Sequence, residues 1–160
     1  MVGLLPLGLV LSMRDKAEVD PAGRSDVDPA RRYRAESALV DVLAEMPPWP
    51  RGAIQRGLLR ANTVLVAGFV ATDHRACPLA SAVWETTGRE PASMFQVQLG
   101  LAELGLTSAQ ASVFAESFDE WAIAGGFVRT DADGLRVLTH RGRSHLLRLF
   151  EATNYSEARS

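Results

Sequence analysis

The feature that most constrains the fold is the stretch GGFVRTDADGLRVLTHRGRSHLLRL, which runs from Gly125 to Leu149. Two short runs that alternate apolar and polar residues flank the turn-like sequence DADG. Asp-Gly suits the positive φ that a tight hairpin turn requires, so the two runs are predicted to form a β-hairpin. Thr139 then begins a helix-like run, because its hydroxyl can accept a hydrogen bond from an unpaired backbone N–H. The stretch therefore predicts a hairpin followed by a closing helix.

Two helices are predicted immediately before this hairpin. Residues 91–104 (PASMFQVQLGLAEL) have the apolar spacing of a helix, and Gly105 interrupts it. Thr107 and Gln110 have the spacing of a capping box, in which each side chain accepts from the other residue's backbone amide. The helix that follows is predicted to end at Gly125-Gly126. Its apolar face carries Val113, Phe114, Phe118, Trp121 and Ala122.

The N-terminal half of the chain predicts three further helices and one ambiguous segment. Asp28-Pro29 is a good helix start, because Asp caps free amides and Pro fits the first helical position. Residues 30–46 then repeat apolar positions at helical spacing, and residues 51–62 and 78–88 are predicted as shorter helices. The run TVLVAGFV, residues 63–70, is too short for periodicity to separate a buried strand from a helix.

Residues 91–150, about 60 of the 160, resemble the second half of a winged helix-turn-helix domain of the broad MarR-like kind. The matching features are Trp121, the helix exit at residues 125–129, Asp133-Gly134 at the hairpin tip, and the LT-x-x-G pattern that ends at Gly142. Gly142 is expected to let the closing helix approach the hairpin. The resemblance implies an α-rich α+β, winged-helix-like fold with about six helices and a C-terminal β-hairpin wing. In such proteins the helix before the wing usually enters the major groove of DNA.

The domain organisation is expected to be simple. We expect one domain over residues 30–152, a flexible N-terminal extension over residues 1–29, and a flexible tail over residues 153–160. The apolar start of the chain is shorter than the roughly 20 residues that span a bilayer, and no Lys or Arg precedes Arg14 as a signal peptide would require. No membrane association is therefore expected. Met13 is an alternative initiator.

Charge is unevenly distributed along a chain whose net charge is only −2. Residues 91–126 carry four acids and no Lys or Arg, whereas residues 127–160 carry six Arg against four acids, and residues 30–62 carry six Arg against three acids. Because phosphate neutralisation supplies most non-specific affinity for DNA, an acidic helix is poorly suited to a groove. The wing and the N-terminal helices would have to supply the basic contacts. A continuous basic face joining the wing to Arg51, Arg56 and Arg60 would favour nucleic-acid binding, whereas a basic patch split by the acidic helix would argue against it.

The first functional hypothesis is a cytoplasmic winged-helix transcriptional regulator that binds double-stranded DNA as a homodimer. Some arginines of the hairpin and the closing helix are expected to contact phosphates. Two polar residues of the helix just before the hairpin are expected to lie nearest to the bases, because Gln and Ser can read base edges. The phosphate contacts are Arg129, Arg136, Arg141 and Arg143, and the base contacts are Gln110 and Ser112. The second hypothesis is a protein-interaction module whose acidic helix docks on a basic partner.

A third hypothesis is a thiol-based redox sensor at Cys77, which is the single cysteine of the chain. One cysteine excludes an intrachain disulfide and suits a reducing compartment. Cys77 immediately precedes a helix that begins at Pro78, and His74 lies three residues before it, a setting that can activate a thiolate. A buried structural cysteine is the simpler interpretation. Asp73, His74 and Cys77 lack a fourth ligand of suitable spacing, so no metal site is predicted.

No catalytic function is predicted from the remaining sequence. There is no glycine-rich phosphate-binding motif and no GxSxG nucleophile motif, and adjacent acids such as Asp119-Glu120 do not face each other on a helix. We therefore expect a non-enzymatic protein without a cofactor. The three tryptophans are expected to be core anchors; they are Trp49, Trp84 and Trp121.

Overall fold

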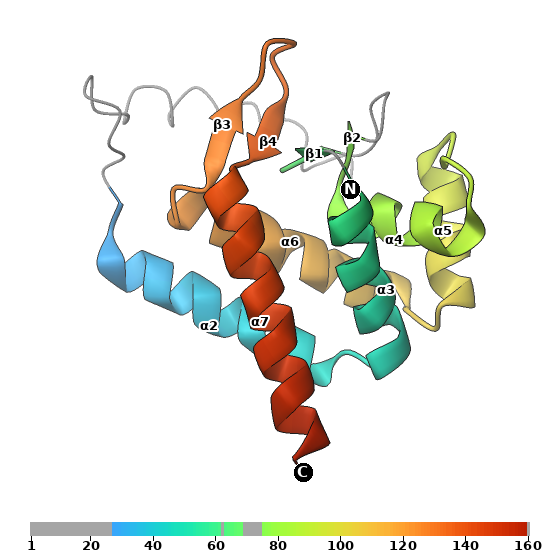
Figure 1. The fold of residues 1–160 in the computed structure, drawn as a ribbon, viewed down its shortest axis with the longest axis horizontal. Helices are drawn as coiled ribbons and strands as arrows, with labels where there is room; N and C mark the ends of the chain where they lie inside the picture. The colour runs from blue at the N-terminus through green and yellow to red at the C-terminus, as the bar shows by residue number, and fades with distance from the viewer. Residues whose placement is uncertain (1–26, 62, 69–74, 160) are drawn as a thin grey trace.

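The computed structural model describes residues 27–61, 63–68 and 75–159. Over these ranges the chain forms six helices and four short strands (Figure 1). The expected helix-rich architecture with a small antiparallel hairpin near the C-terminus is confirmed. Most of the predicted extension over residues 1–29 lies outside the described residues.

The first two described helices follow each other through a short proline-rich connection. α2 (Pro29–Glu45) begins as predicted, because the amide of Ala30 donates to Asp28 Oδ1 at 3.0 Å. α3 (Pro48–Arg60) begins at a proline. An N–H at the first helical position has no intrahelical acceptor, so the missing N–H of proline costs no hydrogen bond there. The proline-rich connection thus ends one helix and starts the next.

The ambiguous run over residues 63–70 begins as a strand, and its described part after Leu65 is irregular. β1 (Thr63–Val64) pairs in parallel with β2 (Arg75–Ala76), and positions 69–74 between them lie outside the described residues. α4 (Pro78–Thr87) follows, with Pro78 in its first turn as predicted. α5 (Met94–Glu103) comes next and begins three residues after the predicted start.

α6 (Ser108–Ala124) has the start that its sequence predicts. The amide of Gln110 donates to Thr107 Oγ1 at 3.1 Å, and the amide of Thr107 donates to Gln110 Oε1 at 2.9 Å. The capping box is therefore confirmed. Gly105 precedes it with a φ of +85°, a backbone conformation that side chains with a Cβ rarely adopt.

The predicted hairpin and closing helix are also present. β3 (Val128–Thr130) pairs antiparallel with β4 (Arg136–Leu138), and α7 (His140–Ala158) begins where the amide of Gly142 donates to Thr139 Oγ1 at 3.0 Å. α7 continues to Ala158, over most of the positions at which a flexible tail is expected, and Phe150 and Thr153 on its inner face are buried.

A single bridge connects the two strand pairs. Leu65 pairs with Val137 of β4, and the amide of Val66 donates to the carbonyl of Arg136 at 3.0 Å. The backbone that follows β1 is therefore attached to the hairpin. In Figure 1 the hairpin projects beyond the helices, with β1 beside it.

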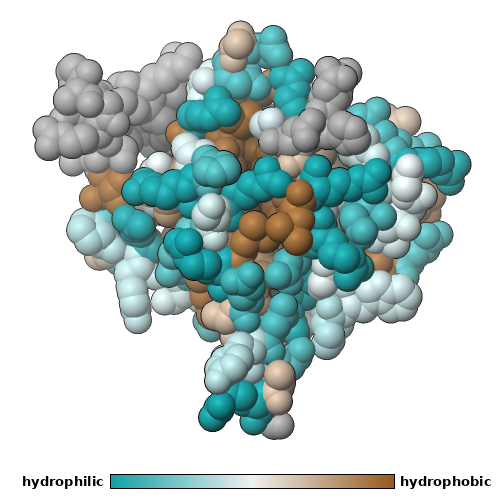
Figure 2. All heavy atoms as spheres, viewed as in Figure 1, coloured by the Kyte–Doolittle hydropathy of each residue, from teal (hydrophilic) through white to brown (hydrophobic). Residues whose placement is uncertain are grey.

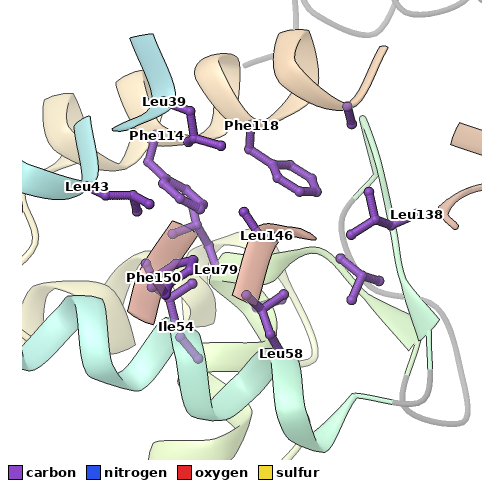
Figure 3. Close-up of a cluster of buried hydrophobic side chains, with 14 of the residues drawn as sticks. Leu39, Leu43, Ile54, Leu58, Leu79, Phe114, Phe118, Leu138, Leu146 and Phe150 are labelled. Carbon is purple, nitrogen blue, oxygen red and sulfur yellow. The ribbon is translucent and has the colours of Figure 1, made fainter. Parts of the chain in front are cut away.

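The core lies between α2, α6 and α7, with further side chains from α3 and α4 (Figure 3). Leu39, Phe114, Leu146 and Phe150 are each 0% exposed, and Figure 3 shows them pointing towards one another. Burial of such large apolar side chains supplies most of the favourable free energy of folding. The three longest helices are thereby held together.

Two glycines permit close approaches between elements. A Cβ at Gly57 on α3 would lie 2.6 Å from the backbone carbonyl carbon of Ser81 on α4, so these helices touch through their main chains. A Cβ at Gly142 would lie 2.7 Å from Phe127 Cβ. The expectation that Gly142 allows α7 to approach the hairpin is therefore confirmed.

Some predictions of burial are wrong. Trp49 is 64% exposed rather than a core anchor, whereas Trp121 is 1% exposed as expected. Val113 is 50% exposed although it was assigned to the same face as Phe114. In both cases the helix is present but the neighbouring elements do not extend over that residue.

Candidate nucleic-acid interface

The tip of the hairpin is built around Asp131. Its Oδ1 accepts from the amides of Asp133 and Leu135, both at 2.9 Å, and Gly134 has a φ of +82°. The amide of Leu135 is the main cause that lowers the pKa of Asp131 from its usual range. Arg75 of β2 reaches this tip, with Nη1 2.6 Å from Asp133 Oδ2 and 3.3 Å from Asp131 Oδ2. The acids of the tip are thus paired with a cation.

The two predicted phosphate contacts of the hairpin have different surroundings. Arg129 on β3 is exposed, and it lies opposite Val137 in the hairpin register. Arg136 on β4 is half-buried and lies close enough to Asp119 of α6 to lower the pKa of that carboxyl. Arg129 is therefore the more accessible of the two.

The two predicted phosphate contacts of α7 each interact with another residue of the chain. The guanidinium of Arg141 is exposed and lies over the ring of Phe127, 5.3 Å from its centroid. Arg143 is half-buried, and its Nη2 donates to the carbonyl of Leu59 at 3.1 Å. Desolvation lowers the pKa of Arg143. Arg143 thus joins α7 to the end of α3.

The predicted base contacts lie at the other end of α6 from the hairpin. Gln110 and Ser112 are both exposed, but Gln110 Oε1 accepts from the amide of Thr107, which leaves only the amide nitrogen for a partner. Fourteen residues separate Gln110 from Ala124 at the end of α6, or about 21 Å along the helix axis. The structure therefore separates the predicted base contacts from the predicted phosphate contacts.

Two acids near the end of α6 are bound by other groups of the chain. Arg31 of α2 donates from Nε to Glu120 Oε2 at 2.8 Å and from Nη2 to Glu120 Oε1 at 2.9 Å. Asp119, expected to be exposed, is half-buried and accepts from the amide of Ala67 at 3.0 Å. Burial raises the pKa of Asp119 to about 6. Both carboxylates thus bind groups of this chain.

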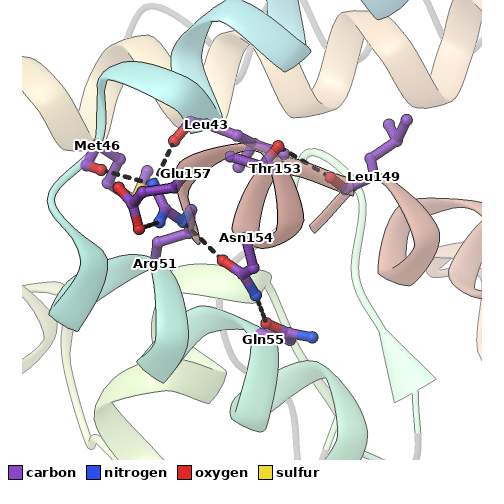
Figure 4. Close-up of polar contacts among 8 residues, drawn as sticks. All are labelled: Leu43, Met46, Arg51, Gln55, Leu149, Thr153, Asn154 and Glu157. Carbon is purple, nitrogen blue, oxygen red and sulfur yellow. Dashed lines mark hydrogen bonds and ion pairs between the residues drawn. The ribbon is translucent and has the colours of Figure 1, made fainter. Parts of the chain in front are cut away.

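Arg51 does not contribute to a basic surface that joins the wing. Arg51 is 1% exposed, because its guanidinium is enclosed between α2, α3 and α7 (Figure 4). Arg56 pairs with Glu85 of α4 at 3.2 Å, and Arg60 is exposed. Figure 2 shows that the face carrying α7 is largely hydrophilic, with a compact hydrophobic patch near its centre.

The thiol hypothesis gains no support from the surroundings of Cys77. Cys77 is half-buried at the start of α4, and desolvation raises the pKa of its thiol to about 11. A reactive thiolate requires the opposite shift. His74, its proposed activating neighbour, lies outside the described residues.

A cluster that the sequence analysis did not find lies between α2, α6 and α7. His145 Nε2 is 2.6 Å from Glu36 Oε1, and Trp121 Nε1 donates to the same oxygen at 3.3 Å. The rings of Trp121 and His145 are stacked with centroids 5.9 Å apart, and Phe127 lies against both. Glu36 and His145 are 109 positions apart, so no local pattern reveals this contact.

Neither a membrane span nor a metal site is found in the described part of the chain. No helix there has both the length and the apolar character to cross a bilayer. Within the same residues no three His, Cys, Asp or Glu side chains come together as a metal site would require. Comparison with protein-family models, curated proteins and solved structures finds no match to this chain.

Proposed function

We propose that the protein is a winged-helix transcriptional regulator that binds double-stranded DNA in the cytoplasm as a homodimer. In this proposal α5 and α6 form the helix-turn-helix pair, and the β3–β4 hairpin is the wing. The Leu65–Val137 bridge supports it, since it places β1 beside the hairpin as a third strand. A fold of this kind hosts several functions. The proposal of DNA binding in particular therefore depends on the surface of α6.

The observation that carries the proposal is the division of α6 into two parts of different charge. Its exposed N-terminal part, residues 108–117, contains one acid, Glu116. Asp119 and Glu120 lie in the second part, where they bind the amide of Ala67 and the guanidinium of Arg31. The surface that would enter a groove therefore repels phosphates less than the sequence suggests.

The hairpin offers a basic contact. Arg129 is exposed on β3, and the acids at the tip are paired with Arg75. A helix in the major groove and a wing that follows the far end of that helix are compatible with contact to neighbouring parts of one duplex. Arg129 and Arg141 are the proposed phosphate contacts, and Ser112 and the amide nitrogen of Gln110 are the proposed base contacts.

Fluorescence anisotropy with labelled genomic DNA fragments over a salt series tests the proposal. We expect binding that weakens steeply with salt, and Arg129→Ala should weaken it uniformly across sequences and reduce the salt slope by about 1. Arg159→Gln is the control, because Arg159 contacts Tyr155 at the other end of α7 from the hairpin. Absence of binding to every fragment at low salt would refute the proposal.

A second candidate function is a protein-interaction module, which is favoured by apolar side chains on the surface of α5 and α6. Phe95, Leu99 and Val113 are 66%, 51% and 50% exposed. The original basis for this candidate, an acidic docking helix, is weakened because Glu120 already binds Arg31. This candidate predicts one stoichiometric protein partner that survives nuclease treatment, is lost in Leu99→Ser and is retained in Arg129→Ala.

A further inference from the structure

α5 is apolar on two opposite faces, and its inner face packs on α4. Val97 and Leu101 on the inner face are 2% and 4% exposed. A Cβ at Gly100 would lie 2.5 Å from Val83 Cγ1 on α4, so the two helices approach each other closely there. Another side chain rotated into this position would clash, so the orientation of α5 about its own axis is fixed.

The outer face of α5 consists of four exposed residues on one stripe, at positions i, i+3, i+4 and i+7; they are Phe95, Gln98, Leu99 and Ala102. Phe95 and Leu99 are 66% and 51% exposed, so no other described element covers them. In Figure 1 α5 lies at the edge of the molecule, beside α4. Large apolar side chains that lie together on one exposed stripe are typical of a surface that binds a partner.

We propose that this outer face binds the same face of α5 in a second copy of the chain, with the two helices antiparallel. In a contact with two-fold symmetry, residue i of one copy meets residue j of the other, and j meets i. The stripe has the same spacing in both directions, so antiparallel helices place Phe95 opposite Ala102 of the second copy. Gln98 then lies opposite Leu99. A large side chain faces a small one at both ends, which allows the helices to approach closely.

Charge also favours a second copy over a charged partner. Residues 94–102 contain no charged side chain, so no like charges would face each other between the copies. The one charged residue of α5 is Glu103, which the antiparallel arrangement places beside the first turn of the other α5. That turn has no acid of its own, and a carboxylate near the N-terminal end of a helix is stabilised by the helix dipole. The face is therefore complementary to itself in both shape and charge.

The proposed interface is small. α5 has ten residues, or a length of about 15 Å. A pair of such helices alone buries less than the roughly 800 Å² per partner of a standard-sized interface. We therefore expect a dissociation constant in the micromolar range.

Sedimentation equilibrium of the full chain tests this inference, over concentrations from about 1 μM to about 1 mM that bracket such a constant. Leu99→Ser should weaken dimerisation at least about tenfold, because the substitution acts twice in a two-fold dimer. Leu59→Ser is the matched control, since Leu59 is 62% exposed on α3, a helix outside the proposed interface. Thermal unfolding of each variant checks that the fold is retained.

Two charged variants test the antiparallel arrangement. Phe95→Lys and Ala102→Glu should each dimerise at least about tenfold more weakly than the wild type, because each places charges against uncharged side chains. An equimolar mixture of the two should associate more tightly than either variant alone. The two opposite charges then face each other at one end of the interface, while the other end keeps its original residues. No gain in the mixture would overturn the antiparallel arrangement.

Three outcomes would overturn the inference as a whole. They are a monomer at every concentration, equal dissociation constants for Leu99→Ser and Leu59→Ser, and a chain that is monomeric alone but forms a stoichiometric complex with a different protein. The inference gives an interface to the homodimer of the proposed function and rests on it in that respect, but its test uses no DNA. A dimer lost in Leu99→Ser that binds no DNA would support this interface and refute DNA binding. A monomer that binds DNA would do the reverse.

Discussion

Arg51 on α3 donates a hydrogen bond from Nη1 to the backbone carbonyl of Leu43 on α2, at 3.0 Å. The same nitrogen donates to the carbonyl of Met46 at 2.9 Å. The last carbonyls of a helix have no intrahelical donor, so a side chain of α3 caps the end of α2. Figure 4 shows the other guanidinium nitrogens bonded to Asn154 and Glu157 of α7. One buried cation thereby joins three helices.

Replacement of Arg51 should therefore be costly. Arg51→Met keeps most of the side-chain volume but leaves the carbonyl of Met46 without a donor, that of Leu43 with only the amide of Met46, and Asn154 and Glu157 without the guanidinium, so we expect a loss of about 3 kcal/mol in the free energy of unfolding. Urea denaturation measures this loss. Arg56→Met is the control, because Arg56 is an exposed arginine of the same helix and its ion pair with Glu85 is worth about 1 kcal/mol or less. Equal losses in the two variants would contradict the capping role.

The parts of the fold that could be predicted from sequence are those fixed by local interactions. The Thr107–Gln110 capping box, the Thr139 cap and the Asp133-Gly134 turn each depend on a few neighbouring residues, and all three are present. Helix starts and tight turns satisfy backbone groups within a few positions of the chain. Their sequence signatures are correspondingly specific.

The predictions that fail depend on which element lies opposite. The periodicity of α6 assigns Val113 to the face of Phe114, yet no neighbouring element covers Val113. The run that begins at Thr63 became a strand only because residues 75–76 and Val137 pair with it. No local sequence window contains the contact with Val137.

The candidate sites were predictable to different degrees. The exposure of Arg129 on the hairpin follows from the alternation of β3, so it could be anticipated. The Arg31–Glu120 ion pair joins residues 89 positions apart, and the cluster of Glu36 and His145 joins residues 109 positions apart. Such contacts arise from helix packing, which the sequence specifies only through the whole core.

The stability of the protein should depend on the protonation of Asp119. Burial raises its pKa to about 6, although the amide of Ala67 and the charge of Arg136 act to lower it. The folded protein therefore binds this proton more tightly than the unfolded chain does. The contribution of Asp119 to stability should fall as the pH rises from about 4 to about 6.

Asp119→Asn isolates this effect, because the side-chain oxygen can still accept from Ala67 but no longer titrates. Relative to the wild type, the variant should gain roughly 2 kcal/mol in the free energy of unfolding between pH 4 and pH 7. Urea denaturation at several pH values measures the difference. Glu151→Gln, at an exposed position on α7, should differ from the wild type by a constant amount. If wild type and Asp119→Asn vary with pH in parallel, Asp119 is not the titrating group.

The contact between α3 and α4 should not tolerate a side chain at Gly57. Gly57→Ala would place a Cβ 2.6 Å from the carbonyl carbon and 2.8 Å from the carbonyl oxygen of Ser81, and neither backbone atom can move alone. Overpacking of this kind costs about 1 to 3 kcal/mol, and the gain in helix propensity offsets up to about 1 kcal/mol of it. We expect a net loss of about 1 to 2 kcal/mol by thermal or urea unfolding.

Gly52→Ala is the matched control on the same helix. A Cβ at Gly52 would lie 3.3 Å from Arg56 Nη1, the far end of a flexible side chain that can move away. Gly52→Ala should therefore be neutral or stabilising by up to about 1 kcal/mol through helix propensity. Equal effects of the two substitutions would show that the close approach of α3 and α4 is not the cause.

The tip of the hairpin should be held in place by Arg75. Its ion pairs with Asp131 and Asp133 join the tip to β2, while the Asp131 side chain organises the turn internally. Arg75→Gln should accelerate amide hydrogen exchange at Asp133 and Leu135, and the free energy of global unfolding should change little because the ion pairs lie at the surface. Asp133→Asn should give the same local effect, whereas Arg89→Gln, at an exposed position after α4, should give none. Unchanged exchange at the tip in Arg75→Gln would mean that the turn alone fixes its conformation.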